Sequence, residues 1–517
     1  MNRYSAPRRL LTLVMSLALV MVFALGGTAS AAVSPDKLFN IVITASYTGF
    51  DPLRTNDSVS TYVNAQLYET LYRLMPNNEF ACLLAAELPE FAEDGLSATI
   101  KLREGVNFHD GTPFNAEAFQ YTYSLIKDPA FGSSRASLVA SIDSVDIVDE
   151  YTVRLNLGYT DGVLLAKLAH TNFAIVSPTA QKKQDLMIDP VGTGAYKFVS
   201  AISGADVVLE ANEDYWGGAP AIKNVKFTIV PEESTAIARL ETGEADFLTN
   251  VSVPQISRVE SIPEVTFGAS PAAAVTYFHA RPTSYVNPLM ANKEFRIALA
   301  MALDSQGYTD YMMEGYAEHS NSMIGPRVFG YTEAAEEFGY RYDPEGARKI
   351  VEENGWQDEP LVFLIASTPA YMPLGEYFQA NLTAAGFNNV HLELLEWSAF
   401  LTETQLDNRF DIALNGWSNV TRDGTELLEP NFETKASSKR TRVDSAELDQ
   451  LILESKTTVD RDVRLEKLEA GNKFLLDEAD VVPVYNAQNL FAYNNAYTGI
   501  IRDVGGTFYI QDFGIAE

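Results

Sequence analysis

Strand–helix–strand segments occur in both halves of this chain, and they restrict its fold more than any other sequence feature. In the first half, strand-like runs at Lys223–Val230 and Ala245–Leu248 flank a short helical pattern. In the second half, Leu361–Ala366 and Val390–Leu395 flank another helical pattern. Strands joined through a helix are typical of parallel or mixed sheets. The sequence therefore predicts an α/β protein, with a length that suits roughly three domains.

Helical spacing of apolar residues predicts further helices along the chain. One covers Val59–Met75, and two amphipathic helices cover Glu447–Ser455 and Arg461–Glu478. Asn115 is a good N-cap for another helix, because its side chain can accept hydrogen bonds from the first turn. We find no short repeat and no low-complexity linker, so we expect strands to join the domains.

The first thirty residues have the layout of an export signal. Three arginines precede an apolar run over 10–25, and small residues end it at Ala31 and Ala32. This order predicts a signal peptide, residues 1–31, that is cleaved after Ala31. A membrane anchor is the alternative, although a span needs ~20 apolar residues. No cysteine lies at the cleavage point to carry a lipid, so we expect a periplasmic protein without a lipid anchor.

Charge and residue counts exclude several kinds of site. The chain has 38 Lys and Arg against 69 Asp and Glu, a formal charge of −31 that repels the phosphates of nucleic acids. Its one cysteine, Cys82, cannot form an intrachain disulfide. Five histidines are scattered at positions 109, 170, 279, 319 and 391, which argues against a zinc site. We therefore expect neither a metal nor an organic cofactor.

The chain carries no catalytic motif. His109-Asp110 could suggest metal ligands, but it lies in an Asp-Gly turn where both side chains can cap backbone groups. The Gly192–Gly194 segment is too short for a dinucleotide loop and precedes a strand, which favours a bend at the strand entry. A secreted hydrolase with two carboxylates stays open as an alternative, because so many acidic residues always place some pair together. We predict a protein that is not an enzyme.

Two tryptophans lie where they could line a ligand pocket. Phe410–Trp417 is an apolar strand that ends in Gly416-Trp417, and a polar loop follows it. Trp397 lies shortly before this strand. An indole at a strand end can line a pocket while the loop supplies hydrogen bonds. The alternative is that both tryptophans are ordinary core aromatics.

Seven segments in sequence order give the chain a resemblance to one family. They are Leu102–Phe114, Val191–Lys197, Asn212–Gly218, Arg239–Asp246, Phe295–Asp304, Phe410–Trp417 and Val482–Tyr485. With them the mature chain resembles the extracytoplasmic solute-binding proteins, family 5, of peptide and nickel ABC importers. It is most similar to the periplasmic oligopeptide-binding proteins. The resemblance implies a monomeric receptor that captures short peptides or another small molecule and delivers them to ABC transporter permease subunits.

The resemblance also implies a fold. It is the two-lobed periplasmic binding protein fold of the large peptide-binding type, with an added third domain on lobe one and two inter-lobe crossovers. The implied ranges are 32–54, 172–271 and 489–517 for lobe one, 55–171 for the added domain, and 272–488 for lobe two. The crossovers would lie near Thr276–Ala280 and Tyr485–Leu490, where strands are also predicted.

Relatives that bind peptides hold the extended ligand backbone in a cleft, much like an added strand. The residues implied to meet the ligand here are Tyr47, Arg135, Trp397, Asn415, Gly416, Trp417, Ser418, Asn419, Asp423 and Tyr485. Most of them belong to the Gly-Trp strand end and its loop. Tyr47 follows the first strand, Tyr485 lies at the second crossover, and Arg135 lies where the added domain meets the peptide in relatives.

One position departs from the oligopeptide binders. They commonly carry an aspartate three residues after the Gly-Trp tryptophan, where it pairs with the ligand α-amine, and this chain has Val420 there. Asp423 could replace that carboxylate if the loop takes a different path. Otherwise the ligand lacks a free amino terminus. The alternative is then an oligosaccharide, an opine or a nickel chelate on the same scaffold.

Overall fold

The computed structural model describes residues 34–516, except 76–78, 284–285, 407–408, 437, 439 and 459. The predicted signal peptide, residues 1–31, lies outside this part of the chain. Among the described residues, no helix is both long enough and apolar enough to cross a membrane.

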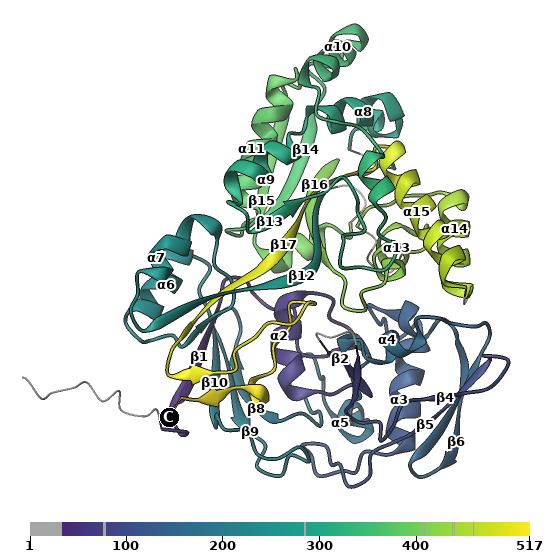
Figure 1. Ribbon diagram of the computed structural model, residues 1–517, viewed down its shortest axis with the longest axis vertical. Helices are drawn as coiled ribbons and strands as arrows, with labels where there is room; N and C mark the ends of the chain where they lie inside the picture. Colours follow the sequence, from purple (N-terminus) through teal and green to yellow (C-terminus); the bar gives the residue numbers. More distant parts are fainter. Residues whose placement is uncertain are drawn as a thin grey trace, which may run out of the picture.

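One long mixed sheet runs through the molecule (Figure 1). Its strands lie in the order β8 (Tyr196–Ile202), β9 (Asp206–Ala211), β10 (Asn224–Ile229), β1 (Leu38–Ile43), β11 (Phe247–Leu248), β17 (Val481–Asn494), β12 (Val265–Ala280), β16 (Ile412–Ser418), β14 (Leu361–Ala366) and β15 (Val390–Leu395). We call the part with β1 and β8–β11 lobe one, and the part with β14–β16 lobe two. β1 is parallel to β10 and β11, and β14 is parallel to β15 and β16. Both predicted strand–helix–strand units are confirmed, with helices α6 (Glu233–Glu241) and α11 (Met372–Ala384).

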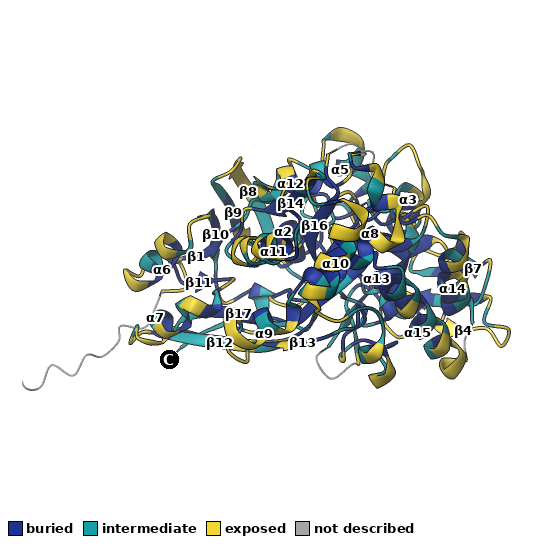
Figure 2. Ribbon diagram, turned by 90° about the horizontal axis from the view of Figure 1, so that it is seen from above, coloured by how far each residue is buried: buried dark blue, intermediate teal, exposed yellow. Residues whose placement is uncertain are grey.

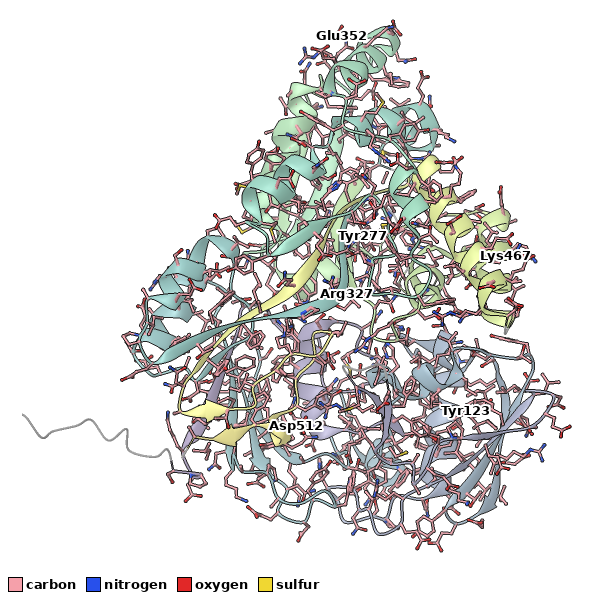
Figure 3. The ribbon with its side chains drawn as sticks, viewed as in Figure 1. Tyr123, Tyr277, Arg327, Glu352, Lys467 and Asp512 are labelled. Atoms are coloured by element: carbon pink, nitrogen blue, oxygen red, sulfur yellow. The ribbon has the colours of Figure 1, made fainter. Side chains whose placement is uncertain are left out.

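The strands β12 and β17 connect the lobes. They have 16 and 14 residues, longer than the usual 3–10, and they pair antiparallel along most of their length. At one end β17 pairs with β11 of lobe one, and at the other end β12 pairs with β16 of lobe two. Both predicted crossovers lie within these two strands. Tyr277 of β12 is labelled in the upper lobe of Figure 3, and Asp512 is labelled in lobe one below it.

The interior consists mainly of buried strands, and exposed residues lie mostly on the outer helices and turns (Figure 2). Phe278, Phe295 and Phe363 belong to the main apolar core of lobe two. The other helices of lobe two are α8 (Lys293–Ala302), α9 (Ser305–Met312), α10 (Pro344–Asn354), α12 (Trp397–Glu403), α13 (Gly424–Phe432), α14 (Ala446–Thr457) and α15 (Arg461–Asp477). The helices α14 and α15 pack against each other at the edge of the lobe (Figure 1).

A small antiparallel sheet lies beside lobe one (Figure 1). Its strands and neighbouring helix are β4 (Glu90–Phe91), β5 (Ser97–Lys101), β7 (Thr152–Leu157), β6 (Ile142–Asp149) and α3 (Ala116–Lys127). Ile100 and Val153 of this sheet share one apolar core with Phe39 of β1. The small sheet and lobe one therefore pack as a continuous unit. Asn115 caps α3 as predicted, since its side chain accepts from the N–H groups of the first turn.

Helix α2 (Ser58–Leu67) is shorter than the predicted helix over Val59–Met75. The segment with Gly192 and Gly194 crosses its last turn, and the N–H of Gly194 donates to the carbonyl of Leu67 at 2.9 Å. A Cβ at Gly194 would lie 2.4 Å from a helix carbonyl oxygen, so only glycine fits there. The chain then turns into β2 (Tyr72–Leu74), which pairs with β3 (Phe80–Cys82). The helix thus ends through contacts from a distant segment, which apolar spacing cannot show.

His109 and Asp110 cap backbone groups, which confirms the turn prediction. The ring nitrogens of His109 lie 2.9 Å from the carbonyl oxygen of Gly194 and 3.3 Å from the backbone nitrogen of Gly192. Burial lowers the pKa of His109 to about 4, so its ring is neutral at pH 7. Asp110 accepts from the N–H of Thr112. Within the described ranges, no group of three or more His, Cys, Asp or Glu could hold a metal ion.

Candidate functional site

A cavity of about 420 Å³ lies between the lobes, and its volume falls in the range of small-ligand sites. Residues after β1 and at the start of α2 line it from lobe one, together with Arg135 and His170. The end of β16 and the segment before α11 line it from lobe two. Parts of β12 and β17 also line it. A molecule in this cavity therefore contacts both lobes at once.

Aromatic rings form much of the lobe-two wall. Trp417, near the end of β16, lies opposite Val275 of β12 in the sheet. The neighbouring Gly416 leaves room for Tyr371, since a Cβ at residue 416 would lie 2.5 Å from the tyrosine hydroxyl. The ring of Tyr371 stacks on that of Trp397, with 6.3 Å between centroids and 5° between planes. These rings give the cavity flat apolar surfaces.

Six of the predicted ligand residues line the cavity. They are Arg135, Trp397, Gly416, Trp417, Ser418 and Tyr485. The ring of Tyr485 stacks on that of Tyr308, which also lines the cavity. The structure thus brings together residues from the second crossover, from the Gly-Trp strand end and from the small-sheet side of lobe one.

The other four predicted residues lie outside the lining. They are Tyr47, Asn415, Asn419 and Asp423. The ring of Tyr47 packs against that of Phe50, at 4.7 Å between centroids. The amide nitrogen of Asn415 lies 2.7 Å from Nε2 of His279, a ring whose pKa burial lowers to about 3. Asn419 donates to the carbonyl of Asp423. Tyr47 thus packs on lobe one, whereas Asn415 and Asn419 support the strand and loop behind the cavity.

The placement of Asp423 does not fit the expected contact with a ligand amine. Nη2 of Arg464 lies 2.9 and 2.7 Å from its two carboxylate oxygens, and both side chains are buried. Asp423 also caps α13 by accepting from the N–H of Thr425. The loop therefore directs this carboxylate into lobe two. Val420 lies in the cavity lining instead.

A buried cluster joins the lobes at one side of the cavity. Oε1 of Glu426, on α13, lies 3.2 Å from Nη2 of Arg135 and 3.0 Å from Nε2 of His170. Nδ1 of His170 accepts from the N–H of Asn172, so Nε2 carries the hydrogen and donates to Glu426. The N–H and hydroxyl of Thr421 donate to the second oxygen of Glu426. We call Arg135, His170 and Glu426 the Glu426 clasp.

The clasp shifts the pKa values of its members. Burial lowers the pKa of His170, and the charge of Arg135 lowers it further, so the ring is neutral at pH 7. Burial alone would raise the pKa of Glu426. The hydrogen bonds from His170 and Thr421, with the charge of Arg135, outweigh burial and hold that pKa below its usual range. Glu426 is therefore a carboxylate whose charge is already neutralised by the protein.

A second cation, Arg440, lies beside the clasp. Its side chain is only 6% exposed and lines the cavity. The guanidinium carbon lies 5.9 Å from the ring centre of Trp417, and that of Arg135 lies 5.3 Å from the same centre. Burial lowers the pKa of Arg440, which shows that its charge is costly in this environment.

The sequence prediction missed Tyr371, His170, Glu426 and Arg440. None of them lies in a recognisable motif, and the folded chain brings them together over long distances. His170 and Glu426, for example, are 256 residues apart. The one usable signal was the group of basic residues at 439–442, which is unusual in so acidic a chain.

Comparisons with known proteins identify the family. The model of "Bacterial extracellular solute-binding proteins, family 5 Middle" matches residues 79–439. The glutathione-binding protein GsiB of Pectobacterium atrosepticum is 30% identical over 436 residues, which cover 81% of this chain and 83% of that protein.

Solved structures show the same fold. A dipeptide binding protein from Pseudoalteromonas sp. SM9913, in complex with Met-Leu, matches with a TM-score of 0.87 and 22% identity, over 93% of this chain and 100% of that one. MoaA of A. tumefaciens R10, in complex with mannopinic acid, matches with a TM-score of 0.85 and 20% identity, over 93% and 100%. The predicted two-lobed periplasmic binding protein fold is confirmed. The chain belongs to the bacterial extracellular solute-binding proteins, family 5, which serve ABC importers.

Proposed function

We propose that this protein is an exported receptor that captures a short peptide between its lobes and delivers it to ABC transporter permease subunits. One observation carries the proposal: the cavity is lined by both lobes. A ligand there contacts both lobes at once, so it stabilises the closed arrangement over the open one. In this proposal residues 1–31 are removed on export, and the protein acts as a monomer in the periplasm.

The end of β16 supplies the main ligand contacts in this proposal. Gly416, Trp417 and Ser418 offer backbone groups to an extended peptide, and Trp417 adds an aromatic surface. Trp397 and Tyr485 pack against ligand side chains from their respective walls. The implied ranges of lobe one, the added domain and lobe two belong to the same proposal.

Glutathione is the first peptide to test. GsiB of Pectobacterium atrosepticum is named for binding it and is the relative with 30% identity. A tripeptide of this kind also suits a cavity of about 420 Å³.

A non-peptide solute is the second candidate, and Val420 is the observation that favours it. Val420 lines the cavity where oligopeptide binders commonly carry the aspartate for the ligand amine. The carboxylates in the described lining, those of Asp57, Glu233 and Glu426, all accept hydrogen bonds from the protein. Of these three, Glu426 is also paired with Arg135, which leaves it unavailable for an α-amine. MoaA, with mannopinic acid, is a relative in fold that takes such a solute.

Identifying the carried ligand tests the proposal directly. The exported protein would be purified without refolding and denatured, and the released small molecules would be identified by mass spectrometry. Glutathione or a mixture of short peptides is the expected result. An oligosaccharide, an opine or a metal chelate would replace the peptide assignment with the second candidate. Incubating the protein with the identified ligand should return it unchanged, since a hydrolase would release cleavage products.

A further inference from the structure

Arg440 is a buried charge without a directly paired carboxylate among the described residues. Within the described part of the chain, no carboxylate oxygen lies within 4.0 Å of its guanidinium. Its one hydrogen bond, from Nη2 to the carbonyl of Asn56, is long at 3.4 Å, and its Nε has no partner. The buried Lys167 and Lys456, by contrast, lie 2.7 and 2.6 Å from a carboxylate oxygen. An unpaired buried charge is costly, so its presence calls for a functional reason.

The groups around Arg440 also lack an acceptor. Nε of Arg135 and Nε1 of Trp417 are buried donors without partners in the described residues. Arg135 and Arg440 both contact Asn56, and both guanidinium groups face the ring of Trp417. Nε of Arg440 and these two atoms are all hydrogen-bond donors. The two guanidinium cations also repel each other. An anionic acceptor would satisfy the donors and remove the repulsion.

The protein's own carboxylates near this point are already engaged. Asp57 accepts from the N–H of Ser60 and the hydroxyl of Thr48. Glu426 is held by the clasp and neutralises Arg135. Arg440 therefore has no carboxylate of the described residues in direct contact, and the charge of Asp57 acts on it only from beyond 4.0 Å.

We propose that the cavity selects an acidic ligand, and that Arg440, assisted by Arg135, binds a carboxylate group of that ligand beside Trp417. The inference rests on the proposed capture of a ligand between the lobes and adds the charge which that ligand must carry. A guanidinium presents parallel N–H donors that match the two oxygens of a carboxylate. Val420 fits the same selection, since it lines the cavity where oligopeptide binders commonly carry the carboxylate for an amine.

Matched pairs of probes test the inference. Ligand-stripped protein would be titrated by calorimetry with glutathione and its diamide, and with Ala-Ala-Ala and its C-terminal amide. In each pair the two forms have nearly the same shape, but amides replace the carboxylates of the acid form. For a pair that binds, we expect the wild-type protein to prefer the acid at least about tenfold, as charge-assisted hydrogen bonds predict. Equal affinities for acid and amide would overturn the inference.

Variants assign the preference to Arg440. Arg440→Gln should reduce the acid-to-amide ratio to within about twofold, and Arg440→Lys should keep part of it, because lysine retains the charge. Arg327→Gln is the matched control, since Arg327 pairs with the exposed Glu318 and neither residue belongs to the cavity lining. It should leave the ratio unchanged. A full preference in Arg440→Gln would remove Arg440 from the site.

Two further measurements distinguish a failure of this inference from a folding defect in the variant and from a failure of the peptide proposal. Removal of an unpaired buried charge should leave the melting temperature of the ligand-free protein unchanged or higher, so Arg440→Gln can be compared as a folded protein. If neither probe pair binds, the peptide proposal fails, and the ligand released from the wild-type protein decides. A neutral or cationic ligand overturns the inference. An acidic ligand that no longer co-purifies with Arg440→Gln supports it.

Discussion

Asp423 and Glu426 lie one helical turn apart, yet their partners give them different roles. Asp423 binds Arg464 inside lobe two and caps α13, whereas Glu426 reaches across the cavity edge to Arg135. The sequence could place a carboxylate in the loop after Trp417, but not its direction. That direction depends on Arg464, which is 41 residues away.

Asp423→Asn should therefore destabilise the fold rather than change ligand selection. Breaking a buried ion pair by removing one partner costs about 3–5 kcal/mol, because Arg464 is left buried without a counter-charge. We expect a loss of unfolding free energy of this order in chemical denaturation. Asp462→Asn, an exposed acid in the first turn of α15, is the control and should cost much less. A selective loss of affinity for peptides with a free α-amine, with stability unchanged, would restore Asp423 as an amine contact.

Trp417→Ala should weaken ligand binding by about 1–3 kcal/mol, through lost stacking and lost apolar contact. Trp417→Phe should lose less, since a ring remains on the cavity wall. Calorimetry with the ligand found on the purified protein would measure both. Binding unaffected by the alanine variant would return Trp417 to the class of ordinary core aromatics, the alternative that its position in the sequence left open.

At the scale of elements, local pattern predicted the two strand–helix–strand units but not the end of α2. The strands and the helix of each unit are neighbours in the sequence, and the spacing of apolar residues changes clearly between them. The sequence alone therefore shows where each strand and helix lies. The end of α2 depends on the close approach of residues 192–194, more than a hundred positions later. The same limit applies to the cavity. The Gly-Trp strand end could be recognised in the sequence, whereas Tyr371 and Arg440 come to the cavity only when the chain is folded.

Gly194→Ala should destabilise the packing of this segment on α2. A Cβ there would lie 2.4 Å from the backbone oxygen of Gln66, which cannot move as a flexible side chain would. We expect a loss of about 1–3 kcal/mol of unfolding free energy, the usual cost of overpacking. Gly162→Ala is the control, because its Cβ would meet no atom closer than 3.7 Å. If both variants unfold at the same denaturant concentration, the glycine is not needed for this contact.

At the scale of the whole molecule, two long strands and a set of side-chain contacts connect the lobes. β12 and β17 are continuous through both lobes and pair with each other along most of their length. The Glu426 clasp and the hydrogen bond from Thr160 to the carbonyl of Thr457 join the lobe-one side to lobe two only when the lobes are close. Closure should therefore depend on the protonation states within the clasp.

Acidification should favour the open arrangement, and His170 should set where this begins. In the closed form the pKa of His170 lies below its ordinary value near 6.5, so the closed form disfavours the protonated ring. The stabilisation of the closed form by the neutral His170 ring is therefore complete above pH 6.5. It is lost progressively as the pH falls below that value. The lowered pKa of Glu426 acts in the same direction, but only below its ordinary value of about 4.5. As the pH falls below the ordinary value of histidine, His170 is thus the first member of the clasp whose protonation opposes closure.

We expect ligand affinity to fall up to about tenfold from pH 7.5 to pH 5, with a parallel increase in the radius of gyration by small-angle X-ray scattering. His170→Gln should remove most of this decline, because glutamine can still donate to Glu426 but does not titrate. His109→Gln is the matched control. That histidine is also buried with a lowered pKa, but its ring contacts Gly192 and Gly194, away from the lobe-two side chains. An equal decline in wild type and His170→Gln would show that closure does not depend on this histidine.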